Sequence, residues 1–205
     1  MRSDSIAFAV AGVLFGLLAG WVIGSQQAGS RMPAPPPAAT TAAPAPAGAG
    51  SQAIPLDEAR ATSLKDVAGR QPSDPAPRVQ LGNMYFDAER FDEAIAWYTD
   101  ALKLDPSDVN VSTDLGVSYY YTNRPDRALE QFDRSLELDP MHTKTFLNMG
   151  IVKAFGKQDL EGAAAAWTKV VELAPDSPEG QAARGALERM RAAHAGEVGG
   201  APATP

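Results

Sequence analysis

Two neighbouring stretches of this chain repeat each other with a period of about 34 residues. The segment PRVQLGNMYFDAERFDEAIAWYTDALKLDPSD aligns without a gap to VSTDLGVSYYYTNRPDRALEQFDRSLELDP. A fixed period of this length is typical of arrays of stacked helical units, each of which buries its apolar face against its neighbours. The matching positions are Leu81 and Leu115, Gly82 and Gly116, Tyr85 and Tyr119, Ala94 and Ala128, Tyr98 and Phe132, and Pro106 and Pro140.

A third copy follows, with one extra residue near FGKQDLEG, and carries Gly150, Ala163, Trp167 and Pro175. The pattern resembles the tetratricopeptide repeat (TPR) family, whose unit is a helix with L-G-x2-Y, a turn, and a helix with A-x3-F-x2-A and a closing proline. The resemblance implies an all-α fold, an α-solenoid of helix pairs. In it the glycines and alanines allow close helix approach, and the large aromatic residues fill the space between the helices.

The chain departs from the family pattern at a few positions. The tryptophan usual in the first helix is replaced by Arg78, Ser112 and Phe146. The tyrosine of the third copy is replaced by Lys153, and the late alanine by Ser135 and Val170. These departures change single positions and leave the assignment intact, because the first two copies agree at several positions with one spacing.

The same period extends beyond the three copies. Pro72 precedes Pro106 by one full period, which predicts a half-repeat that caps the start of the array. Ser177 and Pro178 are typical of a helix start, and a closing helix would cover the last apolar face. The expected segments are a cap at 55–72, TPR 1 at 74–107, TPR 2 at 108–141, TPR 3 at 142–176, a closing helix at 177–194 and a disordered tail at 195–205.

An apolar run near the start predicts a membrane anchor. Residues 6–23 carry no charge and would form about 27 Å of helix, close to the thickness of the hydrocarbon core. We expect a short tail at 1–5 and a transmembrane signal anchor at 6–24, in a bacterial inner membrane with the repeats facing the periplasm. A cleaved signal peptide is the alternative, although its apolar core is usually about 7 to 15 residues.

The predicted anchor carries a stripe of small residues, and a linker follows it. Gly12, Gly16, Gly20 and Gly24 form a small-xxx-small face that predicts contact with a second copy or with a partner helix. The alternative is that the stripe makes no specific contact and only reflects the composition of membrane helices, in which glycine is common. Residues 25–54 are rich in proline and alanine and are expected to be a disordered linker, either a spacer of required length or a tract with no length requirement.

Composition excludes several classes of function. The net charge of −7 over 205 residues argues against nucleic-acid binding. Cysteine is absent and the two histidines lie far apart in the sequence, so we expect neither a metal site nor a cofactor. No phosphate-binding glycine loop, catalytic triad or carboxylate pair stands out, and we expect a protein that is not an enzyme.

The resemblance implies that the first helices line a concave groove for a partner peptide. Aromatic residues are frequent at the implied contact positions, which suits an apolar or amphipathic peptide. In a short stack the same aromatics can instead pack against a neighbouring helix. The groove residues implied are Asn83, Phe86, Val117, Tyr120, Tyr121, Lys144, Leu147, Ile151 and Phe155.

Some relatives hold a C-terminal carboxylate in a clamp of lysine, asparagine and arginine. Here the clamp positions hold Val79, Asn83, Asp114, Lys144 and Asn148. Because only two match and Asp114 would repel a carboxylate, a receptor for chaperone tails is disfavoured.

The features together predict a membrane-tethered, non-catalytic adaptor or scaffold that binds a protein or peptide. One alternative is a chaperone of envelope assembly, such as a factor that holds apocytochromes c. The other alternative is a structural membrane protein that associates with itself.

Overall fold

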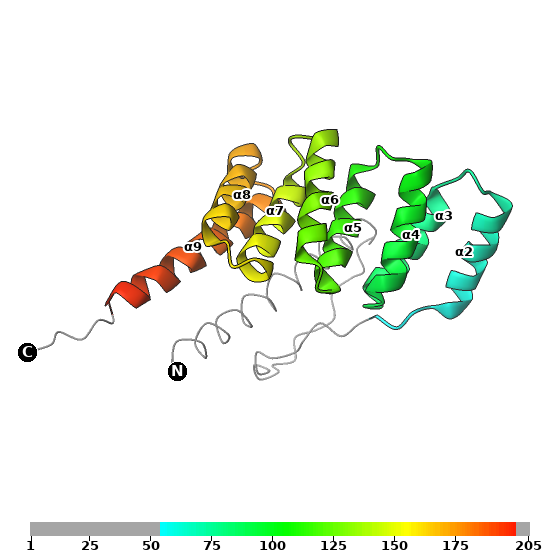
Figure 1. Ribbon diagram of the computed structural model, residues 1–205, viewed down its shortest axis with the longest axis horizontal. Helices are drawn as coiled ribbons and strands as arrows, with labels where there is room; N and C mark the ends of the chain where they lie inside the picture. The colour runs from blue at the N-terminus through cyan, green and yellow to red at the C-terminus, as the bar shows by residue number, and fades with distance from the viewer. Residues whose placement is uncertain (1–53, 200–205) are drawn as a thin grey trace, which may run out of the picture. The chain divides into compact units, whose positions relative to one another are not determined.

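The computed structural model describes residues 54–199, which from Pro55 onward belong to one compact unit. Every regular element in this range is a helix, and no strand occurs there (Figure 1). The prediction of an all-α solenoid is therefore confirmed for the described residues. The elements are α2 (Glu58–Arg70), α3 (Ala76–Asp87), α4 (Phe91–Leu104), α5 (Val109–Tyr121), α6 (Pro125–Leu138), α7 (Thr143–Ile151), the π-helical turn η1 (Val152–Gly156), α8 (Leu160–Leu173) and α9 (Pro178–Gly199).

The helices pack as successive pairs. The pairs α3 with α4, α5 with α6 and α7 with α8 make close contacts, α2 packs on α3, and α9 packs on α8. Helix α5 also contacts α7, and α7 contacts α9. The first helices of the pairs, α3, α5 and α7, therefore form an inner layer, and α4, α6 and α8 form an outer layer (Figure 1).

A glycine opposite a large aromatic ring joins the two helices of each pair. A Cβ atom added to Gly82 would lie closer than 3.0 Å to the Tyr98 ring, and one added to Gly116 would meet the Phe132 ring equally closely. The third pair repeats this arrangement with Gly150 and Trp167. Tyr98, Phe132 and Trp167 are at most 3% exposed. The predicted roles of the repeated glycines and aromatic residues are confirmed.

Polar caps fix where several helices begin. Asp57, Asp108 and Asp159 each accept a hydrogen bond from a backbone N–H in the first turn of α2, α5 and α8, at 2.8 to 3.0 Å. Ser177 caps α9 in the same way, since its Oγ accepts from the Gly180 N–H at 3.0 Å, as the sequence predicts. Helix α9 continues past the predicted end at residue 194 to Gly199, because Gly196, the one glycine inside this extension, costs only about 1 kcal/mol in a helix.

Each inner helix ends in a turn with one left-handed residue. These residues are Glu89, Asn123 and Gln158, with φ between 56° and 59°. In the third turn the extra residue is absorbed by η1, where the Lys157 N–H donates to the Val152 carbonyl at 3.1 Å, one residue further back than in an α-helix. The insertion therefore leaves the pairing of α7 with α8 intact.

The left-handed turns provide a test of backbone strain. Gln158→Gly should raise the free energy of unfolding by about 0.5–1 kcal/mol, because a side chain is unfavourable at positive φ and glycine is not. Asn123→Gly is the matched control and should change it less, since asparagine tolerates this conformation. Urea denaturation of both variants measures the difference. A Gln158→Gly protein less stable than the wild type would contradict the left-handed conformation of Gln158.

Several predictions fall on residues that the structure does not describe. The anchor at 6–24, its glycines at 12, 16, 20 and 24, the linker up to residue 53 and the tail from residue 200 lie outside the described range. Within residues 54–199, no helix combines the length and the hydropathy that crossing a bilayer requires.

Candidate peptide-binding face

The predicted groove residues lie on α3, α5, α7 and η1, and they fall into two groups by exposure. Four are buried, with 1% to 8% of their surface exposed: Phe86, Val117, Leu147 and Ile151. The others keep intermediate exposure: Asn83, Tyr120, Tyr121, Lys144 and Phe155. Contact of these residues with a peptide stays a prediction, and the second group has the side-chain surface for it.

An aromatic cluster, formed by Phe86, Phe91, Tyr120 and Tyr121, joins the first two helix pairs. The Phe91 and Tyr121 rings are stacked with centroids 4.5 Å apart, and Phe86 meets both rings edge-on at 5.3 and 5.9 Å. Tyr120 lies 5.9 Å from Tyr121. Phe91 could not be predicted from the repeat, because its equivalent one period later is Pro125 and the position shows no repeat pattern.

Tyr120 extends the aromatic cluster to the third pair. A Cβ atom added to Gly156 in η1 would lie 3.1 Å from Cε2 of Tyr120 and 2.9 Å from Cβ of Pro125. Burial raises the pKa of both tyrosines, that of Tyr121 to about 12, so their hydroxyl groups are neutral at physiological pH. The cluster thus combines apolar rings with neutral hydroxyl groups.

The inner helices also carry two carboxylates and one ammonium group: Asp87 on α3, Asp114 on α5 and Lys144 on α7. The Lys144 Nζ is 2.7 Å from Oδ1 of Asp114, and these side chains are 23% and 13% exposed. Burial raises the pKa of Asp114, although Lys144 acts against this shift. Burial also raises the pKa of Asp87, and the charge of Asp114 adds to the effect. Of these three groups, Lys144 pairs with Asp114, and Asp87 forms no ion pair within the described residues.

Hydroxyl groups and one imidazole connect α5 to α7. Thr113 Oγ1 lies 2.7 Å from Thr145 Oγ1, and both threonines are fully buried. His142 Nδ1 lies 2.7 Å from Thr145 Oγ1. Burial lowers the pKa of His142, which favours the neutral ring. Across the described residues, no group of three histidine, aspartate or glutamate side chains could hold a metal ion.

The polar groups at the clamp positions have internal partners. Lys144 is paired with Asp114, and Asn83 Oδ1 accepts a hydrogen bond from the Tyr98 hydroxyl at 2.8 Å. Asn148 is 4% exposed and donates its Nδ2–H to the Lys144 carbonyl at 2.9 Å. This arrangement supports the prediction that the face does not hold a C-terminal carboxylate.

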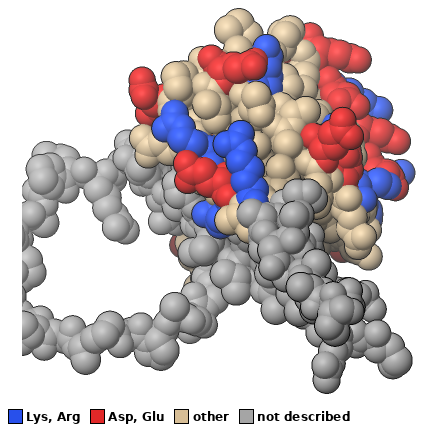
Figure 2. Space-filling view, turned by 90° about the vertical axis from the view of Figure 1, so that its left-hand side faces the viewer, with Lys and Arg blue, Asp and Glu red and all other residues tan. Residues whose placement is uncertain are grey.

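The surface at one end of the array is charged, unlike the aromatic cluster. Figure 2 shows acidic and basic side chains interspersed over the described part of that face, with no wide area of a single charge. On α8, for example, Lys169 Nζ is 3.6 Å from Oε2 of Glu172. Exposed pairs of this kind contribute little to stability or affinity.

Family models match the central helices. Residues 82–123 match a model described as TPR repeat, and residues 111–142 match one described as tetratricopeptide repeat. No curated protein matches the chain.

Solved structures resemble the helical array as well. The NMR structure of the first TPR domain of human RPAP3 is 26% identical, with a TM-score of 0.55 over 63% of this chain and 99% of that one. The first TPR of Spaghetti (RPAP3), bound to the HSP90 peptide SRMEEVD, is 27% identical, with a TM-score of 0.50 over 69% and 98%. The crystal structure of MamA shares the fold at 15% identity, with a TM-score of 0.54 over 67% and 88%. Together with the family models, these likenesses support the TPR family for the array.

Proposed function

We propose that this TPR array is a membrane-tethered adaptor that holds a partner polypeptide on its inner face and catalyses no reaction. The partly exposed Tyr120, Tyr121 and Phe155 carry the proposal, because aromatic side chains supply much of the affinity at protein interfaces. The similar domain from Spaghetti (RPAP3) has a peptide bound, which supports the same use of the fold.

The partner segment is apolar or amphipathic and is not held by a C-terminal carboxylate. The aromatic cluster offers apolar contact area to such a segment. Asp87 and Asp114 repel a carboxylate, and the ammonium group of Lys144 is already paired. This chemistry differs from that of an acidic peptide such as SRMEEVD.

The tether part of the proposal depends on the sequence. The uncharged run at 6–23 has the length of a bilayer span, and the linker at 25–54 could hold the array away from the surface. We place the protein in a bacterial inner membrane as a single-pass protein with its repeats in the periplasm. Alkaline carbonate extraction tests the tether: the full chain should stay with the membrane, and a chain lacking residues 6–24 should be released.

A crosslinking experiment tests the groove. A photoreactive benzoylphenylalanine replaces Tyr120 in the full chain in its native membrane. We expect a defined adduct with a partner polypeptide. The matched control places the same group at Thr168, an exposed residue of the outer helix α8, where the adduct should be at least tenfold weaker. No adduct at position 120, or a stronger one at 168, would contradict the proposal.

A further inference from the structure

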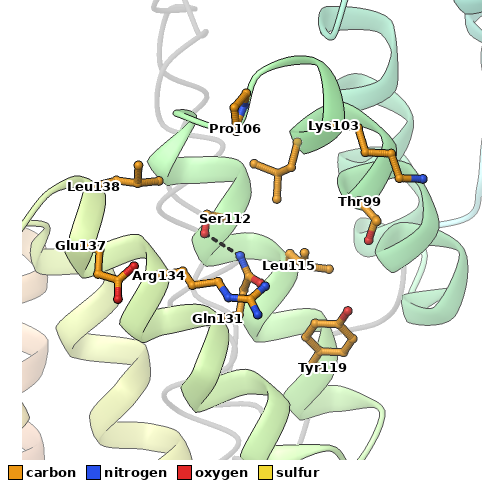
Figure 3. Close-up of a pocket in the computed structure, with 11 residues that line it drawn as sticks. Thr99, Lys103, Pro106, Ser112, Leu115, Tyr119, Gln131, Arg134, Glu137 and Leu138 are labelled. Carbon is orange, nitrogen blue, oxygen red and sulfur yellow. Dashed lines mark hydrogen bonds between the residues drawn. The ribbon is translucent and has the colours of Figure 1, made fainter.

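A second concave site lies on the outer layer, away from the inner face. A pocket of about 400 Å³ opens between α4 and α6 above α5 (Figure 3). Its apolar walls are formed by Leu102, Pro106, Leu115 and Leu138. Leu138 is 46% exposed, which is unusual for a leucine and extends the apolar wall to the rim. We call this site the outer pocket.

The outer pocket exists because a small residue occupies a position that is large in the other repeats. Ser112 stands one period after Arg78 and one period before Phe146. Arg78 reaches back toward α2, and its guanidinium donates to the carbonyls of Asp74 at 2.8 Å and of Ala68 in α2 at 3.3 Å. The TPR pattern has tryptophan at this position. The second repeat therefore lacks the side chain that would fill the space.

The floor of the outer pocket is polar. The Gln131 side-chain amide donates to Ser112 Oγ at 2.7 Å, as Figure 3 shows, and Ser135 Oγ lies 2.8 Å from the same oxygen. All three residues are at most 7% exposed. The Gln131 amide oxygen accepts no hydrogen bond from any described residue. An acceptor of this kind on a pocket floor favours a ligand that brings an N–H or O–H group.

A cation borders the same space. Arg134 lines the outer pocket, and in Figure 3 its side chain extends toward the point where Gln131 meets Ser112. Within the described range it forms no ion pair, whereas Lys103 nearby is paired with Asp100 at 2.7 Å. A guanidinium at the mouth of an apolar pocket can lie over the face of an aromatic ring.

We propose that the outer pocket binds a tryptophan side chain presented by a partner polypeptide. The indole ring lies between Leu102, Leu115 and Leu138, its N–H donates to the Gln131 amide oxygen, and Arg134 covers its face. The volume is at the lower end of the range for ligand pockets, about 300–1,000 Å³, and suits one large side chain. The site is independent of the inner face, so the adaptor engages a partner on both layers.

Titration of the full-length protein with indole tests the proposal. Backbone amide chemical shifts of α4, α5 and α6 should change with a dissociation constant of about 1 mM, as expected for so small a ligand. 1-Methylindole, which lacks the N–H group, should bind about fivefold more weakly. The capped peptide Gly-Trp-Gly should bind at least as tightly as indole. Equal binding of both indoles, or binding of indole without the peptide, would overturn the proposal.

Two variants test the location. Ser112→Trp should fill the outer pocket with the chain's own indole and abolish the shifts. Leu138→Asn alters an exposed rim residue, which keeps the variant folded, and should weaken indole binding at least threefold. Leu104→Asn is its matched control: Leu104 is 39% exposed but lies outside the outer pocket, so binding should not change. Indole binding that is unaffected by both Ser112→Trp and Leu138→Asn would place the ligand elsewhere and overturn the proposal.

Discussion

Gly82→Leu is expected to lower the free energy of unfolding by more than about 3 kcal/mol, which is a large part of the stability of a domain this size. A Cβ atom at this position would already meet the Tyr98 ring at less than 3.0 Å, and a leucine adds three more carbon atoms. Tyr98 is 1% exposed and cannot move aside without disturbing the contact of α3 with α4. Thermal unfolding followed by circular dichroism measures the effect.

Gly69 is the matched control for this prediction. It also lies in a helix, α2, but a Cβ atom there would meet nothing within 4 Å. Gly69→Leu should therefore keep or slightly raise the melting temperature, because leucine favours helix more than glycine does. The double variant Gly82→Leu/Tyr98→Ala should lose less stability than the two single losses added together, since alanine makes room for the leucine. A Gly82→Leu protein that melts like the wild type would show that the ring and the glycine do not pack.

The fold could be predicted because its constraints recur. A glycine opposite an aromatic ring is needed at each helix pair, so the same residue types return at every period and become visible in one sequence. The extra residue of the third copy could be located in the same way. Its conformation could not, because the sequence does not distinguish a longer loop from the π-helical turn Val152–Gly156.

The candidate site was harder to predict, because its contacts do not repeat. Phe91 stacks on Tyr121, yet its equivalents are a proline and a leucine, so no periodic signal marks it. The family positions placed Lys144 in the groove but did not show that Asp114, from the preceding pair, would bind its ammonium group. The outer pocket likewise required the structure, although Ser112 and Ser135 were already visible as departures from the pattern.

Loss of the ion pair between Lys144 and Asp114 is expected to have the second large effect on stability. Lys144→Met should lower the free energy of unfolding by about 3 kcal/mol at pH 7, because it leaves the mostly buried Asp114 carboxylate without its partner. Urea denaturation measures the loss. Lys103→Met is the matched control: its ammonium group pairs with Asp100 at the surface, where both side chains are about half exposed or more, so the change should stay within about 0.5 kcal/mol.

The pH dependence of the unfolding free energy of Lys144→Met separates a structural role of Lys144 from a role in binding a peptide. Burial raises the pKa of Asp114 above 3.8, and Lys144 is the main influence that lowers it, so the variant should have a still higher pKa. Above pH 3.8 the unfolded chain releases this proton while the native variant retains it, so the variant loses stability as pH rises. Below that value the carboxyl is protonated in both states, and the difference from the wild type should close. A variant that loses partner binding but keeps wild-type stability at pH 7 would instead make Lys144 a peptide ligand.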